Sequence, residues 1–379
     1  MRSFYDSIFF NVPPLRFPKF TEEWETKPIN DLAVVIGGGT PDTTVKSYWD
    51  GEIQWFTPSE IGKTKYVDLS LRTITEDGLN NSSAKRLPPN TILLSSRATI
   101  GECSLSLREC ATNQGFQSLV SKKCNVDFLY YLIQTKKNDL IRKSCGSTFL
   151  EISANEVRKI QVSIPSDVEQ QKIAGLLSLI DERIATQNKI IERLETLIKG
   201  LRNEIFWKLR KNVGFNAMIG DVLDYEQPQS YIVEDTEYID KGTPVLTANK
   251  AFILGYTSET EGIYDKGDCI IFDDFTLDSK YVDFPFKVKS SAIKILTAEN
   301  KELLRYTFEF LKYLDLSTSE HKRHYIAETQ NQEFILPTTQ IVRTIAHTFS
   351  ILSLRMETAI KQRLLFEKQK QYLLRQMFI

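Results

Sequence analysis

The sequence has few of the residues from which catalytic and metal centres are usually built. Its 379 residues include five cysteines, an odd number with no Cys-x-x-Cys pair, and this favours reduced thiols over a disulfide framework or a zinc site. The three histidines form no His-Glu-x-x-His motif, and residues 321–324 are predicted to be an exposed basic loop. No Ser-His-Asp set can be chosen from spacing. The sequence therefore predicts a protein that is not an enzyme and has no catalytic or metal-binding residues.

Long hydrophobic runs and an excess of charge of one sign are also missing. The apolar start, residues 4–12, is interrupted by Asp6 and stopped by Pro13 and Pro14. It is too short to span a membrane and lacks the cleavage pattern of a signal peptide. The formal net charge of −1 argues against a non-specific nucleic-acid coat, but not against local basic faces. These absences predict a cytoplasmic protein without a membrane partner.

A run of glycines, Gly37 to Gly39, follows a strand-like segment and is followed by Thr40. A phosphate-binding loop would need a following Lys-Ser/Thr pair, and Pro41 prevents an immediate helix. The run is therefore predicted to be a turn.

The strongest positive pattern is one long helix, from Ser166 to Lys211. The stretch contains no proline, and its apolar residues recur at steps of four and three, which is a heptad seam. Ser166 and Glu169 form a Ser-x-x-Glu capping box at its start. At 1.5 Å per residue the helix would be roughly 69 Å long. The seam residues are Ile173, Leu177, Ile180, Ile184, Ile191, Leu194, Ile198, Leu201 and Ile205, with Gln187 in the one missing place.

The same pattern returns 172 residues later, where Pro165 corresponds to Pro337 and Ile173 to Ile345. Two seam positions of this copy carry Arg363 and Lys370, so its seam is weaker. Neither helix can bury its stripe alone, and the two are predicted to pair with each other. The alternative is two unrelated core helices.

The segments before the two helices read as two α+β domains. In the first, strands are predicted at residues 31–36, 53–57, 91–95, 117–120 and 159–164, and a helix at residues 126–137. Short segments of the second domain match the first in the same order, for example residues 55–58 with 245–248 and residues 90–94 with 268–272. The chain is therefore predicted to be a twofold internal repeat. The predicted divisions are a leader, 1–23; a first domain, 24–164; a central helix, 165–212; a second domain, 213–336; and a C-terminal helix, 337–379.

Polar loop residues beside the strands are candidates for reading DNA. Arg suits guanine edges, Asn and Gln suit adenine, and Lys and Ser suit phosphates. The candidates are Lys63, Arg97, Thr99, Asn113 and Gln114 in the first domain, and Asn249, Lys250, Lys280, Lys287, Lys289, Ser290 and Ser291 in the second.

With these motifs in order, the chain resembles the specificity subunits of type I restriction-modification systems. The resemblance covers nearly the whole chain, although each motif alone is weak. Its segments are Leu15-Arg16-Phe17-Pro18, Gly38-Gly39-Thr40-Pro41, Leu94-Ser95-Ser96-Arg97-Ala98-Thr99-Ile100-Gly101, Thr112-Asn113-Gln114-Gly115-Phe116, Glu169-Gln170-Gln171-Lys172-Ile173, Pro244-Val245-Leu246-Thr247-Ala248-Asn249-Lys250 and Ile271-Phe272-Asp273-Asp274-Phe275-Thr276.

The resemblance implies two target-recognition domains separated by two long antiparallel coiled-coil helices with pseudo-twofold symmetry. It implies that the domains read a split, asymmetric target in double-stranded DNA. It also implies that the helices dock two modification subunits, which carry S-adenosylmethionine, and that ATP-dependent restriction subunits join the complex. The chain itself would hold no cofactor. The alternative function is a coiled-coil scaffold with two protein-binding domains and no role on DNA. A self-contained methyltransferase or nuclease is disfavoured, because its motifs are missing.

Overall fold

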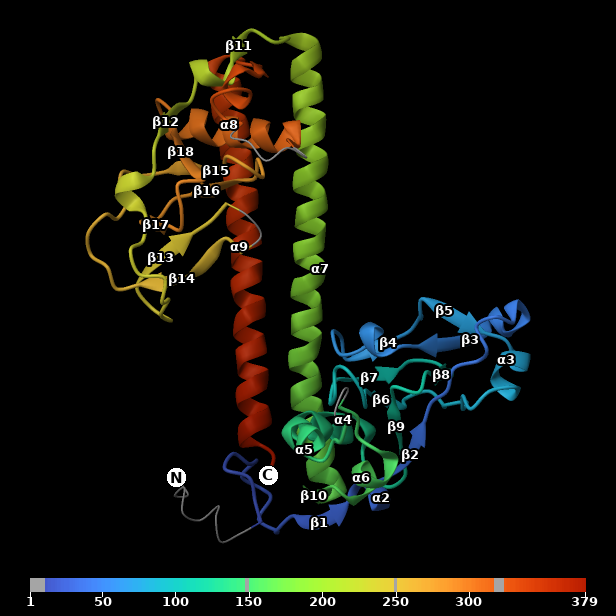
Figure 1. Ribbon diagram of the computed structural model, residues 1–379. Coiled ribbons are helices and arrows are strands. Elements are labelled where there is room, and N and C mark those ends of the chain that lie inside the picture. Colours follow the sequence, from blue (N-terminus) through green and yellow to red (C-terminus); the bar gives the residue numbers. More distant parts are fainter. Residues whose placement is uncertain (1–10, 147–149, 249–250, 317–323) are drawn as a thin grey trace. The chain divides into compact units, whose positions relative to one another are not determined.

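The computed structural model describes residues 11–146, 150–248, 251–316 and 324–379. The chain divides into two compact units. The first comprises Met1–Asn188 with Lys361–Ile379, and the second comprises Lys189–Ile360. Figure 1 labels the helices and strands of both units.

The first unit contains two sheets and a strand pair. Its five-stranded sheet has the order β2-β9-β6-β7-β4, and only β4 and β7 pair in parallel. In its three-stranded sheet, β3 lies between the antiparallel β5 and the parallel β8. The strands are β1 (Glu25–Pro28, paired with β10), β2 (Ala33–Gly37), β3 (Trp49–Phe56), β4 (Tyr66–Val67), β5 (Arg72–Ile74), β6 (Ile92–Leu94), β7 (Cys103–Ser106), β8 (Cys110–Thr112), β9 (Gln117–Ser121) and β10 (Gln161–Ile164).

The helices of the first unit are short, apart from the long helix that it shares with the second unit. They are α2 (Ile29–Leu32), α3 (Glu76–Asn80), α4 (Val126–Thr135), α5 (Lys137–Arg142), α6 (Ala154–Lys159) and the N-terminal part of α7 (Asp167–Asn212).

The second unit repeats this topology. Its four-stranded sheet has the order β12-β18-β15-β16, and in its three-stranded sheet β13 lies between the antiparallel β14 and the parallel β17. The strands are β11 (Ala217–Met218, paired with β19), β12 (Asp224–Glu226), β13 (Thr243–Leu246), β14 (Ile253–Thr257), β15 (Cys269–Asp273), β16 (Ser279–Val282), β17 (Lys287–Val288), β18 (Ile293–Thr297) and β19 (Glu333–Phe334). Its own helix is α8 (Lys301–Leu314), and the second long helix is α9 (Thr339–Gln376).

The two units therefore have matching parts, and the predicted α+β class and twofold repeat are confirmed. The sheet orders β2-β9-β6-β7 and β12-β18-β15-β16 correspond, as do the central strands β3 and β13. Each unit also has an antiparallel strand pair, β1-β10 or β11-β19, that leads into a long helix. The segments that the sequence comparison matched between the two domains each overlap one of these equivalent strands.

The long helices pair within each unit, and the order of the contacting segments is antiparallel. In the first unit, Ile173 and Leu177 near the start of α7 share a core with Leu373 and Phe378 near the end of the chain. In the second unit, the C-terminal part of α7 shares a core with the N-terminal part of α9. The predicted pairing of the two apolar stripes is therefore confirmed in both units.

Lys370 has a partner, although it interrupts the apolar seam. Its Nζ lies 2.8 Å from the Asp181 carboxylate and 5.5 Å from the centre of the Tyr131 ring. Tyr131 donates a hydrogen bond of 2.6 Å to the same carboxylate. The seam at this level is a small polar network rather than a packing defect.

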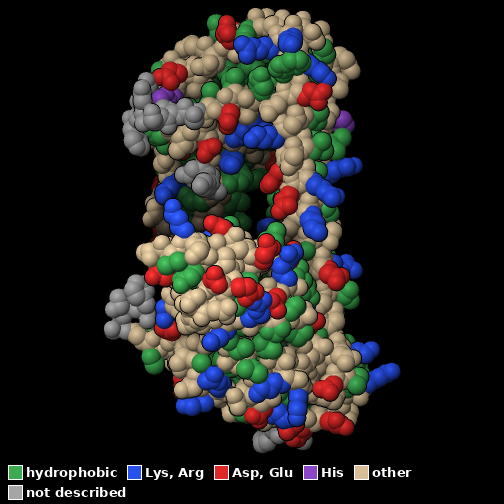
Figure 2. Space-filling model, turned by 90° about the vertical axis from the view of Figure 1, so that its right-hand side faces the viewer, with side chains coloured by type: hydrophobic (Ala, Val, Ile, Leu, Met, Phe, Trp, Pro, Cys, Tyr) green, Lys and Arg blue, Asp and Glu red, His purple; other side chains and the backbone are tan. Residues whose placement is uncertain are grey.

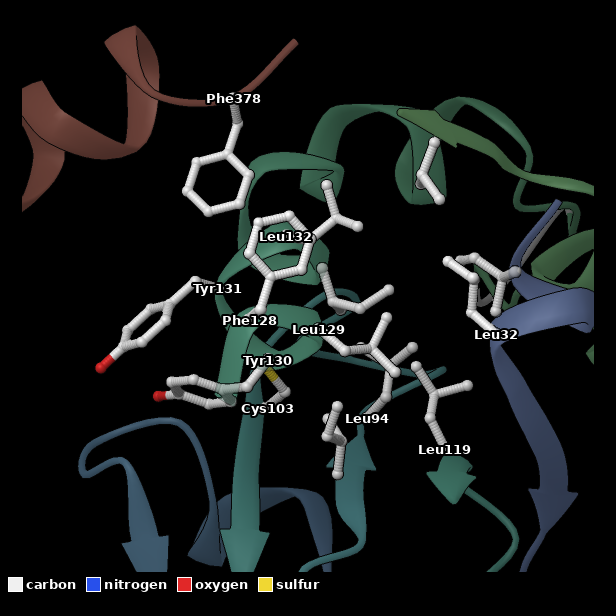
Figure 3. Close-up of a cluster of buried hydrophobic side chains, with 14 of the residues drawn as sticks. Leu32, Leu94, Cys103, Leu119, Phe128, Leu129, Tyr130, Tyr131, Leu132 and Phe378 are labelled. Atoms are coloured by element: carbon white, nitrogen blue, oxygen red, sulfur yellow. The ribbon is translucent and has the colours of Figure 1, made fainter. Parts of the chain in front are cut away.

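Aromatic stacking closes the core of the first unit. The Phe378 ring stacks on Phe128 of α4 at 5.3 Å and meets the edge of Trp24 at 6.3 Å. Figure 3 shows Phe378 beside Phe128, with Leu94 and Leu119 from the sheet farther into the cluster. Residues from both ends of the chain thus complete one core.

The predicted leader is packed against this core where the structure describes it. Val12 is buried, and the Leu15 amide donates to the carbonyl of Gln376. Arg16 donates two hydrogen bonds of 2.7 Å to the fully buried Glu169 carboxylate. Glu169, expected to cap the helix start, thus ties the leader to α7.

Two predicted strands of the first domain begin too early. Ile29 and Leu32 are both buried, and their spacing of three places them on one face of a helical turn, so α2 occupies the start of the predicted 31–36 strand. Lys159 ends α6, whose N-cap Ser153 accepts from the Glu156 amide, so the last strand starts at Gln161. The predicted helix 126–137 ends at Thr135 as α4.

Within the part of the chain that the structure describes, no helix is long and apolar enough to cross a membrane. Figure 2 shows Lys and Arg side chains interspersed with Asp and Glu side chains, in keeping with the net charge of −1.

Candidate nucleic-acid interface

Three loops of the first unit meet at one end of its sheets. They follow β3 (residues 57–63), β6 (residues 95–101) and β8 (residues 113–116), and we call them the first loop edge. The Asn113 amide donates to the carbonyl of Phe56 at 3.1 Å, and the Ser96 amide donates to the carbonyl of Gly115 at 2.8 Å. These bonds join the end of β3 and the loops after β6 and β8 through the backbone, so the three loops lie together.

The turn after β8 presents two amide side chains in different ways. The Gly115 amide donates to Asn113 Oδ1 at 2.9 Å, so this side chain oxygen stabilises the turn. Gln114 is exposed at the tip, and its Oε1 accepts a hydrogen bond of 2.5 Å from the Thr40 hydroxyl. Gln114 is therefore the more available of the two predicted base readers.

The loop after β6 holds Arg97 beside a carboxylate. Arg97 Nη2 lies 2.9 Å from Glu151 Oε2, with 43% of the Arg97 side chain exposed. Thr99 is exposed and its hydroxyl donates to Ser95 Oγ at 3.1 Å. Sequence reasoning missed both Thr40 and Glu151, because each acts through a contact between loops that are distant in sequence.

The second unit has the same arrangement of loops. Residues 274–278 follow β15 and residues 289–292 connect β17 to β18, and we call them the second loop edge. The Lys289 amide donates to the carbonyl of Leu246, and the Asp274 amide to the carbonyl of Ala292, which reproduces the bonds of the first loop edge. The Ala292 amide donates to Ser290 Oγ at 3.4 Å, where the first unit uses Asn113. The two loop edges therefore share their backbone hydrogen bonds but carry different side chains.

Both loop edges contain a strained backbone position. Five described residues other than glycine have positive φ, and three of them are Asp or Asn, which tolerate this conformation. The other two are Ala98, with φ 56°, and Leu277, with φ 62°. Each lies four residues beyond the end of the equivalent strand, β6 or β15. Strain of this kind is retained at ligand-binding sites more often than elsewhere.

The predicted lysines of the second domain are placed unequally. Lys287 is buried, with its Nζ 2.6 Å from the Glu259 carboxylate, so it cannot reach a phosphate as it lies. Lys289 is exposed on the second loop edge. Lys280 lies on β16, directly after that edge. Burial, together with the nearby charge of Lys280, lowers the pKa of Lys312 on α8.

The other predicted residues divide between exposed and undescribed positions. Lys63 and Ser290 are exposed, and Ser291 is half-buried. Asn249 and Lys250 lie outside the described residues. The structure thus brings together Arg97, Thr99, Asn113 and Gln114 on one edge, and Lys280, Lys289, Ser290 and Ser291 on or beside the other.

Three of the thiols and His324 are buried in the described chain. Burial raises the pKa of the Cys103, Cys110 and Cys269 thiols to about 12. His324 was predicted to lie in an exposed loop but is buried, with Nδ1 2.8 Å from Glu328, while residues 321–323 lie outside the described chain. In the described segments, no group of three or more His, Cys, Asp or Glu side chains could hold a metal ion.

We expect one fast-reacting thiol when the folded protein meets a coloured thiol reagent near pH 8. Cys145 is exposed, whereas the other four have a pKa raised to about 12, which leaves roughly one part in ten thousand as thiolate. In denaturant, all five thiols should react rapidly. A Cys145→Ser variant is the control and should show no fast phase. Any fast-reacting thiol in this variant would contradict the burial of the other four cysteines.

Comparison with known proteins identifies the class of the first domain. Residues 21–196 match the family described as "Type I restriction modification DNA specificity domain". The chain is 36% identical over 221 residues to the type I restriction enzyme MjaIX specificity subunit of Methanocaldococcus jannaschii, covering 57% of this chain and 51% of that subunit. It is 43% identical over 151 residues to the EcoR124I/EcoR124II specificity subunit of Escherichia coli, covering 38% and 35%. The match thus spans about half the length of the first relative and less of the second.

A comparison of folds finds a similar protein over nearly the whole chain. The crystal structure of a type I restriction-modification S subunit from M. genitalium superposes with a TM-score of 0.67 over 97% of this chain and 99% of that one, at 16% identity. At this identity the superposition shows a shared fold. Residues 21–196 are therefore similar in sequence to the type I DNA specificity domain. Nearly the whole chain shares the fold of the M. genitalium S subunit.

Proposed function

We propose that this chain is the non-catalytic DNA-recognition subunit of a type I restriction-modification complex in the cytoplasm. Its two loop edges would each read one part of a split, asymmetric target in double-stranded DNA. The observation that carries the proposal is the pair of equivalent loop edges. The same backbone bonds hold different side chains, Asn113 and Gln114 in one unit and Ser290 and Ser291 in the other. Similar frames with unlike side chains suit two different base sequences.

The side chains on the edges have the chemistry for this work. Gln114 offers an amide for an adenine edge, and Arg97 offers a guanidinium for guanine or phosphate. Lys280, Lys289, Ser290 and Lys63 suit phosphate contacts. Lys287 is not available for such a contact, because its buried ammonium group is paired with the Glu259 carboxylate. The net charge of −1 implies modest affinity for the chain alone, with partners adding phosphate contacts.

We further propose that the partners dock on the long helices. Several large apolar side chains of α7 and α9 are exposed, among them Leu179, Leu197, Leu354 and Leu365. Two modification subunits would cover such positions and bring S-adenosylmethionine and the methyl-transfer chemistry. Restriction subunits would add ATP-driven cleavage. The helices would then act as a spacer, because helix length would set the separation of the two parts of the target.

Domain exchange tests the proposal. Replacing residues 24–164 by the corresponding domain of another specificity subunit should change one part of the methylated sequence completely and leave the other part unchanged. The measurement is genome-wide mapping of methylated adenines in a host that carries the modification subunits. The reciprocal exchange of residues 213–336 is the control and should change the other part. An unaltered motif in both strains would reject DNA recognition and favour a protein-binding scaffold.

A further inference from the structure

The Gly38-Gly39-Thr40 motif lies directly against the turn that carries Gln114. The Gly39 amide donates to the carbonyl of Thr112 at 2.8 Å, and the buried Trp55 indole donates to the carbonyl of Gly39 at 2.9 Å. These two bonds fix the backbone of the motif between β3 and the end of β8. Thr40 carries the only side chain of the motif, and this side chain is exposed.

Glycine is required here because of space. A Cβ atom on Gly38 would overlap the backbone oxygens of Thr112 and Asn113, and one on Gly39 would overlap Ser83 and Ala84. Backbone atoms cannot move aside as a flexible side chain can. The two glycines therefore allow an approach that places the Thr40 hydroxyl 2.5 Å from Gln114 Oε1.

The Thr40 hydrogen bond determines how Gln114 presents its amide. The Thr40 hydroxyl donates to Oε1 and so restrains the end of this exposed side chain, which would otherwise be free to turn. One lone pair of Oε1 and both N–H donors of Nε2 are left for a ligand. A glutamine edge with one acceptor beside one donor matches N6 and N7 of adenine in the major groove. Asn113 is not equivalent, because its oxygen accepts from the Gly115 amide.

We propose that Thr40 is a positioning residue that orients the Gln114 amide to read one adenine in the part of the target that the first domain recognises. The inference rests on the proposed function and adds to it the residue pair and the base. The glycines set the distance, the Thr40 hydroxyl restrains the Gln114 amide, and Gln114 makes the contact.

The test uses the full chain, assembled with its modification subunits, and compares three variants. Thr40→Val keeps the shape but removes the hydroxyl, Thr40→Ser keeps the hydroxyl, and Gln114→Ala removes the reading group. The measurement is the methylation rate on duplexes in which each base pair of the target is replaced in turn. The melting temperature of each variant is compared with that of the parent to exclude unfolding.

We expect Thr40→Val to reduce discrimination at a single A·T pair by about tenfold. Gln114→Ala should reduce discrimination at the same base pair, and Thr40→Ser should keep the discrimination of the parent protein. The double variant Thr40→Val, Gln114→Ala should discriminate no worse than Gln114→Ala alone, because both changes remove one contact.

Three results would overturn the inference: unchanged discrimination in Thr40→Val, equal loss in Thr40→Ser, or relaxation at different base pairs in the two single variants. The domain exchange described above separates this failure from failure of the proposed function. If the exchange alters one part of the target while Thr40→Val has no effect, the first domain reads DNA without using the Thr40–Gln114 contact. If exchange alters nothing, recognition itself is rejected.

Discussion

Replacing Glu309 by alanine is expected to destabilise the second unit by about 3–5 kcal/mol. The Glu309 carboxylate is 1% exposed and is shared by two arginines. Arg202 of α7 donates to one oxygen at 2.7 and 2.9 Å, and Arg305 of α8 donates to the other at 2.8 Å. Alanine would leave two largely buried guanidinium groups without their counter-charge. Arg305 would keep only its bonds to the Phe349 carbonyl and the Ser353 hydroxyl.

Urea unfolding, followed by fluorescence and circular dichroism, measures the effect. Glu309→Gln separates charge from shape, because it keeps an acceptor oxygen and nearly the same volume, and its loss should be smaller. Glu204 is the surface control, since its exposed carboxylate pairs with Lys208 four residues later on the same helix. Glu204→Ala should cause little or no measurable change. Equal effects at positions 309 and 204 would show that the buried network does not hold α7, α8 and α9 together.

Replacing Phe206 by alanine is expected to cost about 3–5 kcal/mol, because it removes a fully buried ring from the centre of the second unit. The ring of Phe206 lies 5.4 Å from Tyr306, 5.3 Å from Phe310 and 5.2 Å from Tyr313, measured between ring centres. All three partners belong to α8, so Phe206 packs α7 against that helix. The cavity that remains would be lined by rigid rings that cannot collapse to fill it.

The control for Phe206 is its neighbour Trp207, which is 52% exposed on the same turn of α7. Trp207→Ala removes a larger ring, yet it should cost far less, since most of that ring already contacts solvent. Thermal unfolding of both variants provides the comparison. A smaller loss for Phe206→Ala than for Trp207→Ala would contradict the placement of α8 on α7.

Periodic and repeated features of the fold could be predicted from the sequence. The start of α7 was predicted within one residue, at Ser166 against Asp167, because a heptad seam and a preceding proline define it. The second long helix was predicted by its correspondence to the first. The strands that were matched between the domains proved equivalent in sheet order, since buried strands of a repeat retain similar apolar runs.

Short helices and polar contacts were harder to predict. Helix α6 begins with Ser153 and Glu156, the same Ser-x-x-Glu signal that was recognised at Ser166, but it is followed by too few apolar residues to show a period. Lys287 was predicted on a loop and lies in a buried pair with Glu259, 28 residues earlier in the chain. No local sequence pattern predicts such a pair. The same holds for Thr40 with Gln114 and for Arg97 with Glu151. The limits of the DNA-reading domains, 24–164 and 213–336, stay predictions.

The division of the chain into units has a consequence for its synthesis. The second unit is one continuous segment, Lys189–Ile360, whereas the first needs Lys361–Ile379 as well. Leu373, Met377 and Phe378 are buried in the core that also contains Trp24 and Phe128. During synthesis on the ribosome, the core of the first unit therefore stays incomplete until Lys361–Ile379 have been made. The second unit needs no residue beyond Ile360 to complete its own core. The order of maturation is the reverse of the order of translation, and during that interval the apolar surface around Phe128 stays uncovered for a chaperone or for misassembly.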